Sequence, residues 1–215
     1  MSGRPAMLRK LQRGLEALYR IEGSACVSGF LIDADARDRL GVARAPREQL
    51  LVAEDEDGVS VGLFVDDEAL SNLAVHDPVR RLDDRNLGDF LLAVEGVSHF
   101  VYLMWRARHD ARVSALELEV QAEVDKYVTC LLCGDHGPER SAALRRRLFD
   151  DVAFDDDLDG DERHRYRVAN ANALRYSESL ERRYVRSGRI ADMLGELRRF
   201  YRLPLDGKLD LIRAA

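Results

Sequence analysis

The sequence predicts an α+β fold, in which a small antiparallel β-hairpin sheet is followed by a helical bundle. Two short apolar runs flank the Asp57-Gly58 pair, a pattern typical of a tight hairpin turn. After position 84 the apolar residues instead recur at helical spacing, with Gly, Asp and Asn between the segments. We therefore expect a helix-plus-sheet subdomain over 1–84 and a helical bundle subdomain over 85–215, packed together as one domain.

The elements of the first subdomain follow from local patterns. Leucines recur at helical spacing from Leu8 to Leu18, and Gly23 follows where a helix would end. Runs of apolar residues bounded by turn residues indicate strands. The expected elements are a helix over 7–21, strands over 25–32, 49–53 and 59–65, a short helix over 68–73 and a loop over 74–84.

Helices account for the rest of the expected fold. Asp110 is expected to cap a helix, because an aspartate side chain accepts hydrogen bonds from the free N–H groups of a first turn. Pro204 is expected to end the last helix, because proline cannot continue one. The expected helices cover 87–109, 111–133, 141–149, 161–184 and 189–202.

Composition excludes several classes of function. The formal net charge of −6 argues against nucleic-acid binding, because phosphate contacts need a basic surface. No charge-free apolar stretch reaches the ~18 residues of a membrane span, and the first residues lack the apolar segment of a signal peptide. The three cysteines cannot all pair, which suggests a reducing compartment. We therefore expect a cytoplasmic protein that binds neither nucleic acid nor membranes.

The stretch 87–106 of the helix expected over 87–109 is apolar on most of its faces and carries one polar stripe. At about 100° per residue, Glu95, His99, Tyr102 and Arg106 share a single sector. A helix that is apolar almost all round is buried, and a buried carboxylate is costly unless it is paired or binds a metal. Glu95 and His99 are neighbours at i and i+4. They are therefore the first candidates for a site.

A second candidate set lies on the helix expected over 111–133. Glu117 falls near the middle of its apolar face, Gln121 and Glu123 lie at the margins, and Glu119 points away. If the two helices pack antiparallel, the side chains of this set converge on those of Glu95 and His99.

The order of hairpin, buried helix and second acidic helix, over residues 48–128, resembles the small gluzincin-type zincin metallopeptidases. In that family a His-Glu-x-x-His helix follows an edge hairpin, and a later helix supplies a glutamate ligand. The corresponding string is Glu95-Gly96-Val97-Ser98-His99, in which His99 matches the second histidine ligand and Glu95 stands in place of the first. Gly96 stands in place of the catalytic glutamate.

This resemblance implies a degenerate metallopeptidase-like domain that binds zinc or another divalent metal. The implied metal ligands are Glu95 and His99, with Glu117 or Glu123 as the third. Glu95 and Tyr102 are also the candidate catalytic residues, and Tyr102 would orient the oxyanion of a substrate or ligand. Because Gly96 replaces the general base, no ordinary peptidase activity is expected.

Other interpretations of these residues stay open. Glu95 and His99 can form a purely structural network, with Glu95 paired to Arg106 or to an arginine of the last helices. The chain can also act as a non-catalytic adaptor or regulatory subunit that works through a protein partner.

Two further segments contain metal-binding residue types. The spacing of Cys130, Cys133 and His136 is plausible for zinc ligands. Two cysteines that are simply small core residues near a helix end would give the same pattern. Residues 155–160 match the first half of a calcium-binding EF-hand loop, but Tyr166 stands where the bidentate glutamate belongs.

Overall fold

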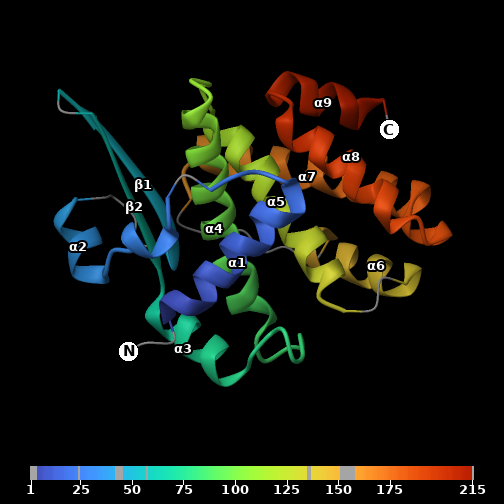
Figure 1. Cartoon of the computed structure of the whole chain (residues 1–215), viewed down its shortest axis with the longest axis horizontal. Helices are drawn as coiled ribbons and strands as arrows, with labels where there is room; N and C mark the ends of the chain where they lie inside the picture. The colour runs from blue at the N-terminus through green and yellow to red at the C-terminus, as the bar shows by residue number, and fades with distance from the viewer. Residues whose placement is uncertain are drawn as a thin grey trace. The chain divides into compact units, whose positions relative to one another are not determined.

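A two-stranded antiparallel sheet and a set of helices make up the described part of the chain, which confirms the predicted α+β class (Figure 1). The computed structural model describes residues 4–23, 25–41, 46–56, 58–134, 137–150 and 158–214. The chain divides into two compact units. The sheet unit comprises Met1–Ala17 and Ile21–Asp110, and the bundle unit comprises Leu18–Arg20 and Ala111–Ala215.

The sheet unit holds both strands and the helices of the first half of the chain. The last residues of its first helix group with the bundle unit. Its elements are α1 (Arg4–Tyr19), the 3-10 helix η1 (Val27–Gly29), α2 (Ala34–Arg39), β1 (Glu48–Asp55), β2 (Gly58–Val65), α3 (Asp67–Val75) and α4 (Leu87–Arg108).

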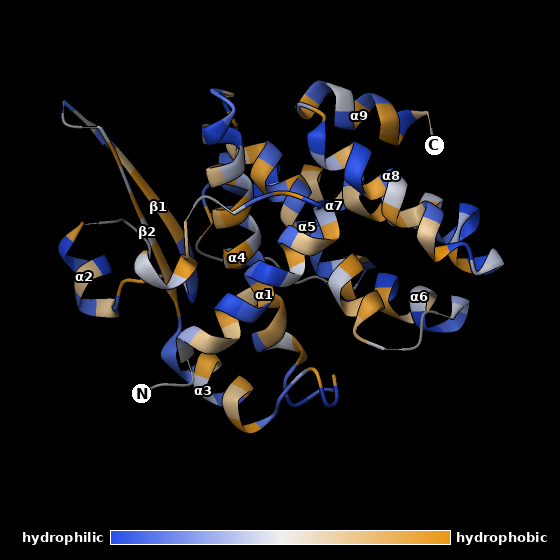
Figure 2. Ribbon diagram, in the orientation of Figure 1, coloured by the Kyte–Doolittle hydropathy of each residue, from blue (hydrophilic) through white to orange (hydrophobic). Residues whose placement is uncertain are grey.

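The β1–β2 hairpin is buried at one end only. Its register runs from Glu48 opposite Val65 at the base to Asp55 opposite Gly58 at the turn. Gly58 has a φ of 137°, which side-chain-bearing residues rarely adopt, so a glycine suits this turn. Along β2 the residues change from exposed beside the turn to buried at the base. The middle of β1 is nevertheless hydrophobic in colour (Figure 2).

The strand predicted over 25–32 is wrong in its main part. Val27–Gly29 form η1 instead, and of the segment 25–32 only Leu31 makes a bridge, parallel to Leu63 of β2. The physical reason is the side chain of Gln12, which accepts a hydrogen bond from the Val27 amide at 2.8 Å and donates one to the Ala25 carbonyl at 2.7 Å. It occupies backbone groups that a strand would pair with a neighbouring strand.

Helix α4 is the core helix of the sheet unit. The side chain of Asn86 donates to the carbonyl groups of His76 and Arg81 at 2.9 and 2.8 Å, which holds the loop before the helix. Both strands of the hairpin lie against α4. Among the described helices, α4 is long and apolar enough to cross a membrane by length and composition alone. The 18-residue window that meets this test is 61% buried inside the protein, as expected of a core helix.

Within the described residues of the bundle unit, all regular secondary structure is helical. Helices α5 and α7 pack against each other along much of their lengths. At the start of α7 the side chains and backbones of Asp159 and Glu162 form a capping box. The elements are α5 (Ala115–Leu132), α6 (Pro138–Arg145), a π-helical turn (Arg146–Asp150), α7 (Gly160–Arg183), η3 (Val185–Ser187), α8 (Ile190–Arg202) and α9 (Leu205–Arg213).

Two predicted helix ends in the second half of the chain are wrong. Asp110 does not cap α5, because its φ of 50° is left-handed, whereas a capping residue is normally extended. Ser114 caps the helix instead and accepts a hydrogen bond from the Glu117 amide at 3.2 Å. The helix that ends before Pro204 is also not the last, because the chain continues as α9 with Pro204 as its N-cap residue. Proline is tolerated there because the first amides of a helix need no partner within it.

Candidate metal site

Helix α4 brings Glu95 and His99 together one turn apart. Each residue offers a potential ligand atom, and the two atoms lie within 4.8 Å of each other. His99 is only 7% exposed and Glu95 is partly buried, on a helix whose other inward residues are largely apolar. An imidazole and a carboxylate at this spacing and depth can bind a divalent metal ion or form a structural pair.

A second carboxylate reaches His99 from the hairpin. Glu48 is the first residue of β1, and its Oε1 atom lies 3.6 Å from Nδ1 of His99. Both side chains are 9% exposed. Sequence reasoning missed Glu48, because a glutamate at the start of a strand carries no signal that separates it from an ordinary polar residue.

Gly96 makes room for that carboxylate. A Cβ atom at position 96 would lie 2.9 Å from Cγ of Glu48, 3.0 Å from its Oε1 and 3.1 Å from Cδ1 of Leu63. These separations are shorter than van der Waals contact, so the glycine lets Glu48 lie against the helix backbone. The zincin resemblance predicts a catalytic glutamate at position 96, where this chain has glycine. In the structure, the carboxylate of Glu48 lies beside this glycine.

Tyr102 is buried on the same helix. Its side chain is fully inaccessible, and its ring centroid lies 5.8 Å from that of Trp105. An oxyanion-orienting role would require a ligand to reach this depth. That role stays a prediction.

The acidic residues of α5 lie in the bundle unit. Glu117 is 4% exposed in the first turn of the helix, and Glu123 pairs with Lys126 at 2.5 Å. The expectation that Glu119 points away from the protein is wrong, because Glu119 is 7% exposed and its Oε1 lies 3.7 Å from Nε of Arg165. The face of α5 that carries buried residues is wider than a projection of its apolar residues suggests. The assignment of Glu117 or Glu123 as a third metal ligand stays a prediction.

A buried polar network in the bundle unit was also missed. The amide of Gln121 donates to Oδ1 of Asp125 at 2.9 Å and to the hydroxyl of Tyr19 at 3.3 Å, and Tyr19 donates to the same carboxylate. Lys208 of α9 donates to Oε1 of Gln121, and its ammonium lies 4.7 Å from the ring centroid of Phe200. Desolvation raises the pKa of Tyr19 well above its usual value, and the charge of Asp125 adds to this. The members come from segments far apart in sequence, so no local pattern reveals them.

The two secondary metal candidates gain little from the structure. Cys130 is fully buried, and burial raises the pKa of its thiol to about 12, as expected of a core cysteine. His136 lies outside the described residues. In the acidic loop, residues 155–157 lie outside the described part of the chain, and Asp159 accepts a hydrogen bond from the Glu162 amide at 2.7 Å as a helix cap.

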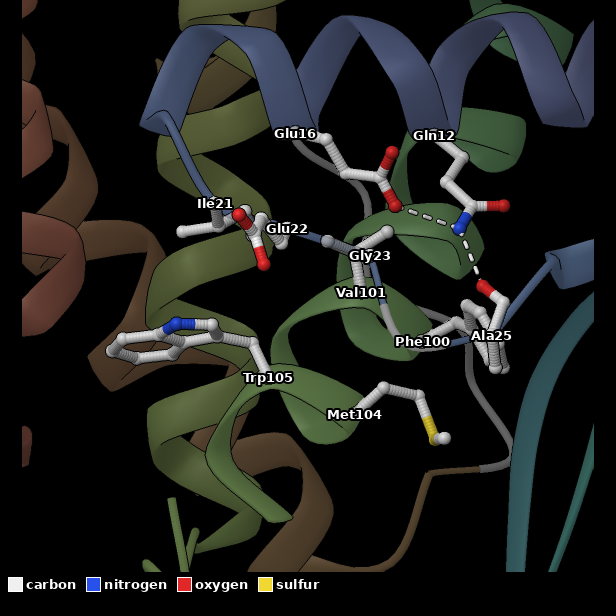
Figure 3. Close-up of a pocket in the computed structure, with 10 residues that line it drawn as sticks. All are labelled: Gln12, Glu16, Ile21, Glu22, Gly23, Ala25, Phe100, Val101, Met104 and Trp105. Atoms are coloured by element: carbon white, nitrogen blue, oxygen red, sulfur yellow. Dashed lines mark hydrogen bonds between the residues drawn. The ribbon is translucent and has the colours of Figure 1, made fainter. Parts of the chain in front are cut away.

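A cavity beneath α1 in the sheet unit is too small for a ligand (Figure 3). Its volume of about 10 Å³ is enough for roughly one water molecule. The side chain of Glu16 extends toward Gly23, where an added Cβ atom would lie 2.1 Å from Oε1 of Glu16. Gln12 holds the same carboxylate through a hydrogen bond of 2.8 Å. These side chains fill the space, so we do not place a substrate there.

Comparison of the chain with models of protein families, with curated proteins and with solved structures gives no match. The likeness to zincins therefore stays a prediction, and a proposal for function rests on the geometry of the residues themselves.

Proposed function

We propose that the sheet unit binds a divalent metal ion through Glu95 and His99 of α4. The observation that carries the proposal is the position of their ligand atoms, within 4.8 Å of each other on a largely buried helix. Burying an acid and an imidazole has a cost in desolvation, which a bound cation offsets. A mixed carboxylate and imidazole site suits zinc, manganese or iron better than calcium, which prefers oxygen ligands alone.

The proposed site lacks a general base on its own helix. Gly96 occupies the position where the zincin resemblance would require the catalytic glutamate. We therefore propose a metal-binding, degenerate metallopeptidase-like domain and expect no cleavage of unfolded casein, with or without added zinc. Robust cleavage that disappears in Glu95→Gln would contradict this view and make Glu95 itself the base.

The binding experiment uses protein purified without a histidine tag and stripped of metal with a chelator. Isothermal titration with zinc and with manganese is expected to show one site in the wild type. The affinity is expected to fall about tenfold or more in Glu95→Gln and in His99→Gln, since each removes a ligand. Glu22→Gln is the matched control, because Glu22 in the same unit has a side chain that is 90% exposed. Equal affinity in all four proteins would refute the proposal.

Thermal unfolding of the metal-free protein separates this proposal from a purely structural pair. If Glu95 and His99 serve the fold, Glu95→Gln leaves a buried partner without its charge and should destabilise the protein by about 1–3 kcal/mol. If they serve a metal, carboxylates gathered at the site repel one another when the metal is absent. Glu95→Gln should then be as stable as the wild type or more so. A clear loss of stability, without metal binding in the wild type, would establish the structural role.

A non-catalytic adaptor is the second candidate function. The observation in its favour is the distal half of the hairpin, where Val52 and Val59 are 52% and 63% exposed. Exposed apolar side chains on a projecting strand pair suit contact with a protein partner. An adaptor without a metal would show no change in melting temperature when zinc or manganese is added, whereas the metal site predicts a rise.

A further inference from the structure

Three arginines of the bundle unit, Arg20, Arg198 and Arg202, form a cluster where α1 and α8 end. Arg198 donates a hydrogen bond from Nε to the Leu18 carbonyl at 2.8 Å. Arg202 donates from Nη2 to the carbonyl groups of Tyr19 and Arg20 at 3.1 and 3.2 Å. Its Nη1 donates to the Arg198 carbonyl at 2.7 Å. Two guanidinium groups therefore cap the last carbonyls of α1, which lack amide partners within that helix.

Capping does not explain the third arginine. Arg20 follows the last residue of α1 with a φ of 51°, and the Ile21 amide donates to the Glu16 carbonyl at 3.0 Å. Glycine normally fills this position after a helix, because a side chain is unfavourable at a left-handed φ. The Arg20 side chain is exposed and makes no hydrogen bond or ion pair within the described part of the chain. Its backbone strain is therefore not offset by any contact of this side chain with those residues.

The charges of the arginine cluster repel one another. Partial burial lowers the pKa of the Arg198 guanidinium, and the charges of Arg20 and Arg202 lower it further. Among the residues that the structure describes, no carboxylate pairs with any of the three. The cluster stands in a chain whose formal net charge is −6, so it is a local concentration of positive charge. A ligand of negative charge would offset the repulsion.

The charge of the cluster matches that of a phosphate group. Three guanidinium groups carry three positive charges, and the two helix C-termini beside them each contribute about half a negative charge. About two positive charges remain, and a phosphate monoester carries about −1.5 to −2 at pH 7. The planar fork of a guanidinium also fits phosphate oxygens. Nη1 and Nη2 of Arg198 and the guanidinium of Arg20 donate to no described residue, so these groups are available to a ligand.

We infer that the arginine cluster binds the phosphate group of a small soluble molecule. Arg20 and Arg198 donate to the phosphate oxygens, and Arg202, whose Nη groups are occupied by carbonyls, contributes its charge. A small molecule is favoured over a nucleic acid or an acidic membrane, because the net charge of −6 opposes approach to a polyanionic surface. The inference is independent of the metal site, because all three arginines belong to the bundle unit.

The test titrates ¹⁵N-labelled protein with inorganic phosphate at constant ionic strength, balanced with sodium chloride, and follows the backbone amides by NMR. The wild type is expected to show saturable shifts at residues 18–21 and 198–203. Arg198→Gln is expected to bind phosphate about tenfold or more weakly, because it removes charge-assisted hydrogen bonds. Arg199→Gln is the matched control, because Arg199 is an exposed arginine of the same helix and is not among the charges that act on Arg198.

Arg20→Gly separates phosphate binding from capping. Glycine relieves the left-handed backbone, so without phosphate this variant is expected to melt a few degrees above the wild type. It is also expected to bind phosphate about tenfold or more weakly, because a donor is lost. A lower melting temperature in Arg20→Gly would show that the side chain serves the fold and would overturn the inference.

The remaining outcomes also decide the matter. A wild type without saturable shifts, or one whose phosphate affinity is unchanged in Arg20→Gly, overturns the inference. Should Arg198→Gln fail to fold, Arg198→Lys keeps the charge without the fork and is expected to bind phosphate more weakly than the wild type. Sedimentation with vesicles of phosphatidylcholine and phosphatidic acid, without a response to inorganic phosphate, would also overturn it.

Discussion

Replacing Gly96 with alanine measures how tightly the carboxylate of Glu48 is held against α4. The added Cβ atom would lie within 3.1 Å of three side-chain atoms, two from Glu48 and one from Leu63. Crowding of this kind in a packed region costs about 1–3 kcal/mol. Alanine also gains about 0.8–1 kcal/mol over glycine inside a helix. We therefore expect Gly96→Ala to lower the free energy of unfolding by about 0–2 kcal/mol.

Gly14→Ala is the control that isolates the crowding. Gly14 lies inside α1 of the same unit, and a Cβ atom there would meet nothing within 4 Å. Gly14→Ala should therefore stabilise the protein by about 0.5–1 kcal/mol through helix propensity alone. The difference between the two variants gives the cost of crowding at position 96, about 1–3 kcal/mol.

Urea unfolding followed by circular dichroism supplies both values, provided that the dependence on urea is the same in each variant. In a Glu48→Ala background the cost of Gly96→Ala should shrink, because most of the crowding atoms are gone. If Gly96→Ala stabilises the protein as much as Gly14→Ala does, the side chain of Glu48 is not held against the helix.

Two further predictions concern groups outside the site. Iodoacetamide at pH 7.5 should modify the exposed Cys26 first, because a hydrogen bond with Ser28 lowers the pKa of its thiol. Burial raises the pKa of the Cys130 thiol to about 12, so Cys130 should react only after unfolding. Mass spectrometry of the modified peptides gives the order of reaction, and the reverse order would contradict this prediction. Burial opposes the charge of Glu181, but hydrogen bonds from its neighbours, Arg145 among them, outweigh it and lower the pKa of the carboxyl. A lowered pKa in the folded state stabilises the protein above the unfolded value of about 4.3, and this stabilisation is lost as the pH falls through the folded pKa. Glu181→Gln should therefore destabilise the protein by about 1–3 kcal/mol at pH 7, and its deficit relative to the wild type should vanish in acid; a deficit that is independent of pH would contradict this assignment.

The elements predicted correctly are those whose signals are local. The hairpin was predictable because Asp57-Gly58 separates two runs of strand-forming residues, and α4 because its apolar residues extend over six turns. The segment 25–32 has the composition of a strand as well. Its conformation depends on Gln12, which is thirteen residues from Ala25, and no pattern within the segment reveals that contact.

The same limit applies to the candidate site. Glu95 and His99 could be paired from the sequence because a helix brings i and i+4 together whatever its surroundings. Glu48 is 51 residues away from His99 in the chain, and the register of the hairpin and its packing on α4 decide where its carboxylate lies. Within the sequence of α4, Gly96 is the residue that reflects the presence of Glu48, because it leaves room for that side chain. This role of Gly96 can be recognised only after the position of the neighbouring strand is known.

Two groups of buried polar side chains in this chain differ in the distances between their members. In the bundle unit, Gln121 donates to Asp125 at 2.9 Å, and Lys208 donates to the other end of the same amide, so each group is held by hydrogen bonds of ordinary reach or less. Such a network is satisfied by the protein itself and serves the packing of the helices. In the sheet unit, the 3.6 Å between Glu48 and His99 exceeds hydrogen-bond reach although both side chains are 9% exposed. Titration of the wild type and of His99→Gln with zinc therefore decides whether this second group serves a bound ion or, like the first, the packing of a helix.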